Sequence, residues 1–357
     1  MEYYVCCGVV GENSMIDRSK ILDLARRSLK HDGVHHAQWF ITRKCNYRCR
    51  GCNVWMDSSP VELSTEDVKR GLDILRDIGV LEIVFSGGNP LLRDDIGEIL
   101  DYASKYFITT VYDNGSLALS KIDELRNVDF VAISLDTLDE SKNDYLKGVS
   151  GAWRRAMEAI EALKKEGIPV GVSPTISQMN LHEIVDFTRY FTERKIPVWY
   201  SLYAYDYQPA KGTFSIGKRN DEYEIRDGNA LAEVCDKLMS MKRENGYIYI
   251  TTRTLEAVKH LALTGERIWR CKALKSFLVV DHLGRVSGCH CKEPVASIFD
   301  LPEIWRSPMI KRLQKEYSYC TDCIYLCYIF YSVHAGLTGL LSILFDRWES
   351  IKAYMGK

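Results

Sequence analysis

The sequence predicts an α/β protein built on parallel strands, and two observations lead to this fold class. Six short apolar runs rich in β-branched and aromatic residues read as strands, at 37–42, 81–86, 107–112, 128–135, 168–173 and 197–203. Helical patterns separate them, among them 65–78, 96–105, 153–166 and 182–194. Strands that alternate with helices form parallel βα units. The periodicity alone does not say whether the sheet closes into a barrel.

Composition limits the class of protein further. The 357 residues are 46% hydrophobic and 27% charged, enough to bury one large core and a smaller unit. The net charge of −1 gives no global attraction to nucleic acid, so we expect no nucleic-acid partner. Twelve cysteines without a signal peptide indicate a reducing compartment, the cytoplasm, and thiols that bind metal.

The first predicted strand leads into a segment with three closely spaced cysteines. In ITRKCNYRCRGCNVW, Cys45, Cys49 and Cys52 form a Cys-x-x-x-Cys-x-x-Cys pattern. Iron–sulfur clusters normally take four cysteines, so three would leave one iron open to a small chelating ligand. The alternative is zinc, which prefers two Cys-x-x-Cys pairs around a closed tetrahedron; the Cys45–Cys49 gap is one residue too long for such a pair.

The second predicted strand ends in a glycine turn, Ser86-Gly87-Gly88-Asn89-Pro90, before a helical pattern led by Asp94 and Asp95. Two adjacent glycines let backbone groups approach a ligand with no Cβ in the way. Alone, such a turn is weak evidence for a ligand site. When it follows soon after a three-cysteine loop, it is strong evidence for one.

Together these residues resemble the radical S-adenosylmethionine (SAM) superfamily, over roughly residues 36–205. The resemblance implies a partial (β/α)6 barrel of TIM-like type. It also implies that Cys45, Cys49 and Cys52 bind a [4Fe-4S] cluster whose fourth iron SAM chelates, with Gly87 and Gly88 at the methionyl amino group. Two residues depart from the family pattern: Asn89 replaces the usual Glu, and Gly51 replaces an aromatic residue that contacts the adenine.

Other cofactor residues are expected where strands end, because ligands of such barrels lie at the carboxyl ends of the strands. The Tyr112-Asp113-Asn114-Gly115 segment looks like the family's Thr-Asn-Gly turn. Ser134 or Asp136 is expected to contact the ribose or the methionyl carboxylate of SAM, and Ser173 ends the fifth strand. Substrate is expected at the sixth, beside Ser201, Tyr203, Tyr205, Asp206 and Tyr207. Each of these residues could instead be an ordinary turn or cap.

Six further cysteines follow the last predicted strand: Cys271, Cys289, Cys291, Cys320, Cys323 and Cys327. Their order resembles the SPASM and twitch domains that follow some radical SAM barrels and hold auxiliary clusters. We expect one auxiliary [4Fe-4S] cluster on Cys271, Cys289, Cys320 and Cys323, with Cys291 and Cys327 as spare or alternative ligands. A zinc ribbon is the alternative.

An apolar run, Ile324 to Phe345, contains no Asp, Glu, Lys or Arg. Two interpretations remain open: a helix buried against the barrel, or an apolar surface that meets a lipid substrate or a membrane face. The expected organisation is an N-terminal helical extension (1–34), the barrel (35–235), a twitch/SPASM-like domain (236–330) and a C-terminal apolar helix (331–357).

The resemblance implies reductive cleavage of SAM to a 5′-deoxyadenosyl radical, which abstracts hydrogen from an unactivated C–H bond. An auxiliary cluster favours an oxidation, a crosslink or a new C–C or C–S bond as the net result. We expect a lipid-like substrate first, because it would explain the apolar C-terminus, and a tetrapyrrole of alternative haem synthesis second. A peptide comes third, because the short segment before the barrel leaves no room for a leader-binding domain. The expected electron donor is ferredoxin or flavodoxin. A mere iron–sulfur carrier would have no use for the three-cysteine loop and glycine turn.

Overall fold

The strands form one large sheet that is mostly parallel. A computed structural model of the protein describes residues 20, 23, 26, 27, 34–56, 61–205, 214, 216–321 and 324–335. Within them the sheet has the order β10-β9-β8-β1-β2-β3-β4-β5. Strands β8, β1, β2, β3, β4 and β5 pair in parallel, and β9 and β10 add an antiparallel edge. The strands are β1 (His36–Thr42), β2 (Glu82–Gly87), β3 (Ile108–Asp113), β4 (Phe130–Ile133), β5 (Val170–Val172), β8 (Phe277–Val280), β9 (Arg285–Ser287) and β10 (Ala296–Ser297).

Beyond β5 the parallel arrangement continues through single bridges. Val198 bridges both Val172 and Ile248 in parallel. Strand β6 (Thr175–Ile176) pairs in parallel with β7 (Ser201–Leu202). The sixth predicted strand, 197–203, is thus shorter than expected. Together these elements curl into the partial barrel that the resemblance implied.

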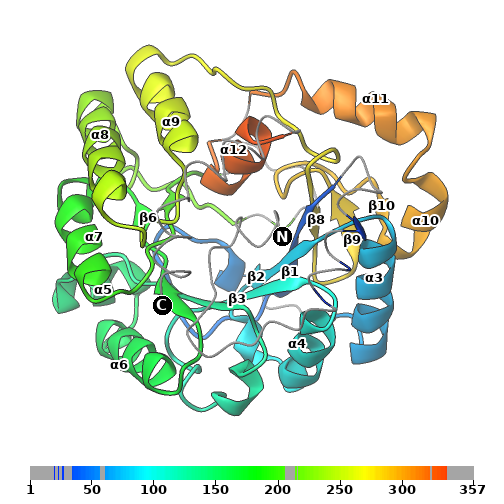
Figure 1. Ribbon diagram of the computed structural model, residues 1–357, viewed down its shortest axis with the longest axis horizontal. Helices are drawn as coiled ribbons and strands as arrows, with labels where there is room; N and C mark the ends of the chain where they lie inside the picture. Colours follow the sequence, from blue (N-terminus) through cyan, green and yellow to red (C-terminus); the bar gives the residue numbers. More distant parts are fainter. Residues whose placement is uncertain are drawn as a thin grey trace.

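Helices surround the strands (Figure 1). The four predicted helices are present, and Ser64 caps the first of them through a bond from the Asp67 N–H. Three helices of the barrel were not predicted, α5, α8 and α9. The helices are α3 (Thr65–Asp77), α4 (Ile96–Ser104), α5 (Glu140–Lys147), α6 (Ala152–Lys165), α7 (Ile184–Glu193), α8 (Gly228–Glu244), α9 (Thr252–Thr264), α10 (Leu301–Ile304), α11 (Pro308–Tyr317) and α12 (Leu326–Val333).

The core lies between the helices and the sheet, and its residues follow from the sequence periods. On α3, Val68, Leu72 and Leu75 recur at helical spacing and are fully buried. Strand β1 is buried on both faces, as parallel strands covered by helices are. Burial of apolar area at ~25 cal/mol per Å² holds these layers together.

The C-terminal part joins the barrel. Strand β8 pairs directly with β1. Helix α12 contacts α9 and β7, and its Tyr328 ring stacks on Phe277 of β8 at 4.9 Å. Figure 1 shows α12 between α9 and β8, where it joins the barrel to the C-terminal part. The boundary predicted at 235/236 falls inside α8; the division into domains remains a prediction.

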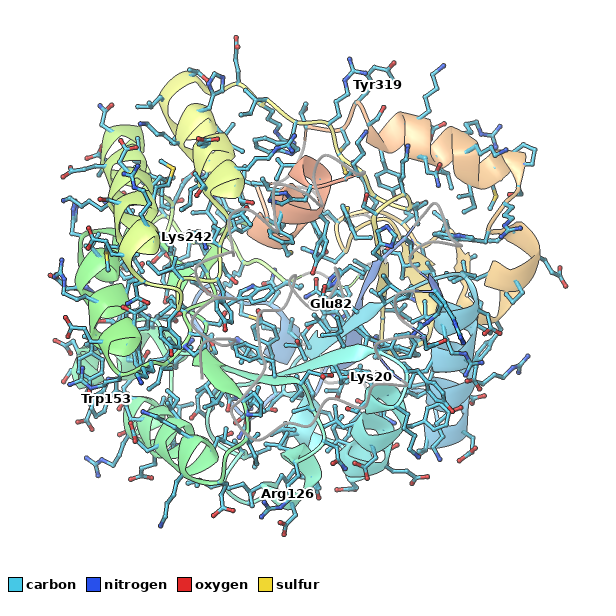
Figure 2. The ribbon with its side chains drawn as sticks, viewed as in Figure 1. Lys20, Glu82, Arg126, Trp153, Lys242 and Tyr319 are labelled. Atoms are coloured by element: carbon cyan, nitrogen blue, oxygen red, sulfur yellow. The ribbon has the colours of Figure 1, made fainter. Side chains whose placement is uncertain are left out.

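Helix α12 also decides between the two interpretations for part of the apolar run 324–345. Residues 328–333 are buried, and the Tyr331 hydroxyl donates to Glu82 Oε2 at 2.6 Å. Figure 2 labels Glu82 near the centre of the ring of elements. The interpretation as a buried helix therefore holds for 326–333, whereas residues 336–345 lie outside the described residues. Among the residues described, no helix is both long and apolar enough to cross a membrane.

Candidate active site

The three-cysteine loop follows β1 and is anchored by backbone bonds on three sides. Gly88 N–H donates to the Thr42 carbonyl at 2.8 Å, and Asn89 N–H donates to the Lys44 carbonyl at 2.7 Å. Farther along, Arg48 N–H donates to the Lys147 carbonyl at 3.2 Å. The backbone of Cys52 pairs with that of Gly217 in an isolated antiparallel β-bridge. The glycine turn, α5 and the 216–218 segment thus hold the loop at the carboxyl ends of the strands.

The two turn glycines are needed for this anchoring. A Cβ on Gly88 would lie 2.0 Å from the Lys44 carbonyl oxygen. A Cβ on Gly87, whose φ is +127°, would lie 2.3 Å from the Thr42 carbonyl oxygen. The glycines therefore let the turn meet the cysteine loop. The predicted contact with SAM stays a prediction.

Cys45, Cys49 and Cys52 are half-buried and close enough for their charges to interact. Burial raises the pKa of the Cys49 thiol to about 12 and that of Cys52 to about 11. As bare thiols they would be protonated, and bound iron would supply the positive charge that favours their thiolate form. Three soft thiols on one loop fit an iron–sulfur cluster. Within the described residues, no group of three or more His, Cys, Asp or Glu side chains is placed to hold a single metal ion.

A buried lysine beside this loop was missed by sequence reasoning. Lys147 Nζ lies 2.7 Å from Asp136 Oδ2 and 2.7 Å from Ser134 Oγ. Burial alone would lower the pKa of Lys147, but the charges of Asp136 and Cys49 outweigh it and raise the pKa. A lysine just before Gly148 looks in sequence like an ordinary helix end. Its position shows only once α5 is folded against the loop.

Two predicted cofactor residues bind each other. Asn89 Nδ2 donates to Asp113 Oδ1 at 2.6 Å, and both side chains are buried. Asp113 also accepts from Gly115 N–H at 2.9 Å and Ala118 N–H at 3.1 Å. Burial raises the pKa of Asp113 in spite of these bonds. The amide at position 89 therefore matches a carboxylate at 113, where a second carboxylate would repel it.

The remaining predicted site residues lie beside the cysteine loop, within the buried core or outside the described residues. Asn114 Nδ2 donates to Asn46 Oδ1 of the cysteine loop at 2.8 Å. Ser173 is buried, and its N–H donates to the Ile133 carbonyl at 2.8 Å. Asp206 and Tyr207 lie outside the described residues. So does Cys323.

Aromatic rings occupy the space beside Gly51. A Cβ there would lie 3.0 Å from the Tyr203 ring and 3.3 Å from the Tyr223 ring. The two rings pack at 5.2 Å, and the Tyr203 hydroxyl donates to the Lys218 carbonyl. The family usually carries an aromatic residue at the position of Gly51. Here two aromatic rings from outside the cysteine loop pack against that position instead.

A hollow of about 500 Å³ opens at the end of β7. Tyr203, Tyr205, Glu224 and Arg226 supply its polar groups, and the rest of the wall is mainly apolar. The larger apolar lining residues are Leu202, Ile225, Leu231, Val258, Leu261 and Ile324.

Four of the C-terminal cysteines line one small cavity: Cys271, Cys289, Cys291 and Cys320. Hydrogen bonding from Cys291 lowers the pKa of Cys289 to about 7, whereas burial raises that of Cys271 to about 11. Cys327 is not among the cavity's lining residues; burial raises its pKa to about 12. Sequence reasoning ranked Cys291 as spare, although it lines this cavity.

Comparisons with known proteins agree with this geometry. Residues 39–191 match the family model "Radical SAM superfamily". The "AdoMet-dependent heme synthase" of Nitratidesulfovibrio vulgaris is 32% identical over 154 residues, 42% of this chain and 42% of that protein. The "Fe-coproporphyrin III synthase" of Methanosarcina barkeri is 34% identical over 166 residues, 44% of this chain and 41% of that protein. The chain thus matches about two fifths of the length of each relative.

The fold extends the likeness over more of the chain. The crystal structure of Streptococcus suis SuiB has a TM-score of 0.62 at 17% identity and covers 84% of this chain and 71% of that one. Because it covers 84% of this chain, the likeness in fold reaches beyond residues 39–191; the SPASM or twitch type of the C-terminal part stays a prediction. Residues 39–191 thus match the radical SAM superfamily, an enzyme family that uses a [4Fe-4S] cluster and SAM.

Proposed function

We propose that this protein is a radical SAM enzyme that oxidises a tetrapyrrole side chain. The observation that carries the radical SAM assignment is the set of three half-buried thiols beside a buried lysine, at the carboxyl ends of parallel strands. A reduced cluster with bound SAM supplies a carbon radical that removes hydrogen from unactivated C–H bonds. The chain's own residues hold these groups, orient them and keep water out.

Cys45, Cys49 and Cys52 would hold the cluster, and Lys147 would face the carboxylate of SAM. Lys147 is only 4% exposed, so its charge acts where water screens it little. Asp136 and Ser134 hold its ammonium group from one side. The anionic end of SAM would then be a third partner of this buried cation, beside Asp136 and Ser134.

The auxiliary cluster would sit in the C-terminal cavity. Cys271, Cys289, Cys291 and Cys320 supply four thiols around one space, which is the ligand number of a [4Fe-4S] cluster. Replacing Cys291 by Ala, with Cys327→Ala as the matched control, tests this set. Loss of about four irons in the Cys291 variant alone supports it, by the iron count of a cubane.

A tetrapyrrole is favoured as substrate by the hollow at the end of β7. Its wall is mainly apolar, which suits a macrocycle, and Arg226 offers a cation to a propionate. Two of the relatives, which are named for haem and Fe-coproporphyrin III synthesis, agree with this choice. The apolar run was the reason to expect a lipid-like substrate. Residues 326–333 no longer support that expectation, because this part of the run is buried.

The first experiment tests the radical chemistry. Anaerobically reconstituted protein should release 5′-deoxyadenosine with dithionite and SAM, and should hold about eight irons. Changing Cys45, Cys49 and Cys52 to Ala should stop the release and leave about four irons, by the same cubane count. A variant that still cleaves SAM would refute the assignment.

The second experiment tests the substrate. Iron coproporphyrin III added to the protein should bind with a shift in its visible spectrum. Arg226→Glu should weaken binding about tenfold or more, by the 1.5–3 kcal/mol of a hydrogen bond to a charged group. Exposed Arg253→Glu serves as the control. If the porphyrin does not bind and a peptide is modified instead, the tetrapyrrole proposal is wrong while the radical SAM assignment stands.

A further inference from the structure

The cavity of the C-terminal cysteines contains a tyrosine that the proposed function does not use. Tyr317, the last residue of α11, lines this cavity together with Cys271, Cys289, Cys291 and Cys320. Its side chain is only 6% exposed. The buried residues of α11 are Ile310 and Tyr317, which lie about two turns apart and therefore on one face of the helix. The helix thus turns the Tyr317 ring toward the cysteines.

Gly288 makes room for the Tyr317 ring. A Cβ on Gly288 would lie 2.5 Å from the ring atom Cζ, which carries the hydroxyl, and 2.7 and 2.9 Å from the two Cε atoms. Gly288 directly precedes Cys289 in the chain. The hydroxyl end of the ring therefore lies against the backbone that leads into Cys289, and the missing side chain at position 288 permits this approach.

The Tyr317 hydroxyl still has a hydrogen to donate. Its oxygen accepts the Gly288 N–H at 3.3 Å. A phenol oxygen that accepts a hydrogen bond keeps its own O–H as a donor. Among the described residues, no acceptor for this O–H is found. Because a buried tyrosine hydroxyl usually has a partner, an open donor beside a cavity indicates a ligand in that cavity.

Three thiols lie close enough to the hydroxyl for their charges to act on it. Burial raises the pKa of Tyr317, and the charges of Cys289, Cys271 and Cys320 raise it further. These three cysteines belong both to the ligand set expected from the sequence and to the set proposed above. The position of the hydroxyl beside the ligands is therefore the same for either set.

Two other hydroxyls line the cavity, and each of them is used differently. The Tyr328 hydroxyl shares a hydrogen with His290 Nδ1 at 2.7 Å. Ser332 Oγ accepts the Lys272 N–H at 3.2 Å and lies within α12, where a serine hydroxyl can donate to the carbonyl one turn back. Tyr317 therefore offers the donor that is left for a ligand.

We propose that Tyr317 donates a hydrogen bond to a sulfur of the auxiliary cluster and makes this cluster easier to reduce. The proposal rests on the proposed function, because it needs a cluster in this cavity. Reduction adds one electron and increases the negative charge on the sulfurs, so a donor stabilises the reduced form more than the oxidised form. Easier reduction suits a cluster that takes up an electron during an oxidation. Tyr317 acts through the cluster and is a positioning residue.

A redox titration of the auxiliary cluster tests the proposal. The parent protein is the triple alanine variant of the cysteine loop, in which only the auxiliary cluster is reconstituted. Tyr317→Phe keeps the ring against Gly288 and removes the hydroxyl. The midpoint potential should become more negative, with a change of about tenfold in the equilibrium constant for reduction, or ~59 mV for one electron.

Tyr319→Phe in the same parent is the matched control. Tyr319 directly precedes Cys320, but its side chain is 64% exposed and does not line the cavity. Figure 2 labels it at the rim of the molecule. Removing this hydroxyl should leave the midpoint potential unchanged.

A second measurement follows the hydrogen itself. Pulsed electron–nuclear double resonance of the reduced cluster, in parent protein reconstituted in H2O or in D2O, should show an exchangeable hydrogen coupled to the cluster. That hydrogen should be lost in Tyr317→Phe and kept in Tyr319→Phe. A role of Tyr317 in packing alone would leave this signal in place, because the phenylalanine ring preserves the packing.

Several results would overturn the proposal. One is a midpoint potential that is the same in the parent and in Tyr317→Phe, and another is an equal shift in Tyr319→Phe. If Tyr317→Phe does not fold, the parent still gives an answer, since a cluster without any coupled exchangeable hydrogen has no donor. A parent that takes up no auxiliary iron would refute the auxiliary cluster of the proposed function and this proposal with it, whereas the other results leave the proposed function intact.

Discussion

The two cysteine regions of this molecule are built in opposite ways. In the loop after β1, three thiols lie within eight residues and are held by backbone bonds to neighbouring turns. In the C-terminal region, Cys271 and Cys320 lie far apart in sequence, and β8, β9 and α11 must fold before they share a cavity. The first site therefore depends on local backbone geometry, whereas the second depends on packing of the whole C-terminal part.

The largest effect should come from Gly88→Val, which attacks the local geometry of the first region. A Cβ 2.0 Å from the Lys44 oxygen forces the glycine turn away from the loop, at an expected cost of about 3 kcal/mol or more in unfolding free energy. The loop cluster should fail to assemble, while auxiliary iron remains. Chemical denaturation and iron analysis check both.

Gly265→Ala is the matched control for that change. Gly265 has a φ of +72° but no atom within 4 Å of a new Cβ, so only backbone strain of about 1 kcal/mol is expected. Equal losses of stability in the two variants would mean that crowding of Lys44 is not what the glycine avoids.

A smaller effect is expected from the Asn89–Asp113 pair. Asn89→Asp places two buried carboxylates side by side, and Asp113→Asn leaves two buried amides facing each other. Each change should lower the unfolding free energy by about 2 kcal/mol, because a buried polar group loses its partner. Exchanging both residues should recover most of the loss, measured as a double-mutant cycle in urea. Additive losses would mean that the bond between the two side chains contributes nothing.

The smallest effect concerns the closure of the barrel by α12. Tyr331→Phe removes the hydroxyl that donates to buried Glu82 and should cost about 1–2 kcal/mol in unfolding free energy. Tyr145→Phe removes an exposed bond to Glu222 and should cost less than about 0.5 kcal/mol. Thermal unfolding compares them. If the two changes cost the same, α12 is not held by Glu82.

The same contrast explains what the sequence could predict. Strands β1 to β5 and helices α3, α4, α6 and α7 carry clear periods, and Cys45, Cys49 and Cys52 form a local motif, so both could be read directly. Lys147 could not be read, because its role depends on α5 packing against the loop. The pairing of β8 with β1 and the closure by α12 are long-range contacts without a local signal. Cys291 was ranked as a spare ligand for the same reason, since spacing does not show which thiols line one cavity.

Electron paramagnetic resonance of the reduced, reconstituted protein, recorded with and without SAM, tests the central claim most directly. We expect two cluster signals, of which only one changes when SAM is added. That signal should be absent after Cys45, Cys49 and Cys52 are changed to Ala, while the other persists and no longer responds to SAM. Two signals that both ignore SAM, or a SAM-sensitive signal that survives the triple change, would contradict the account.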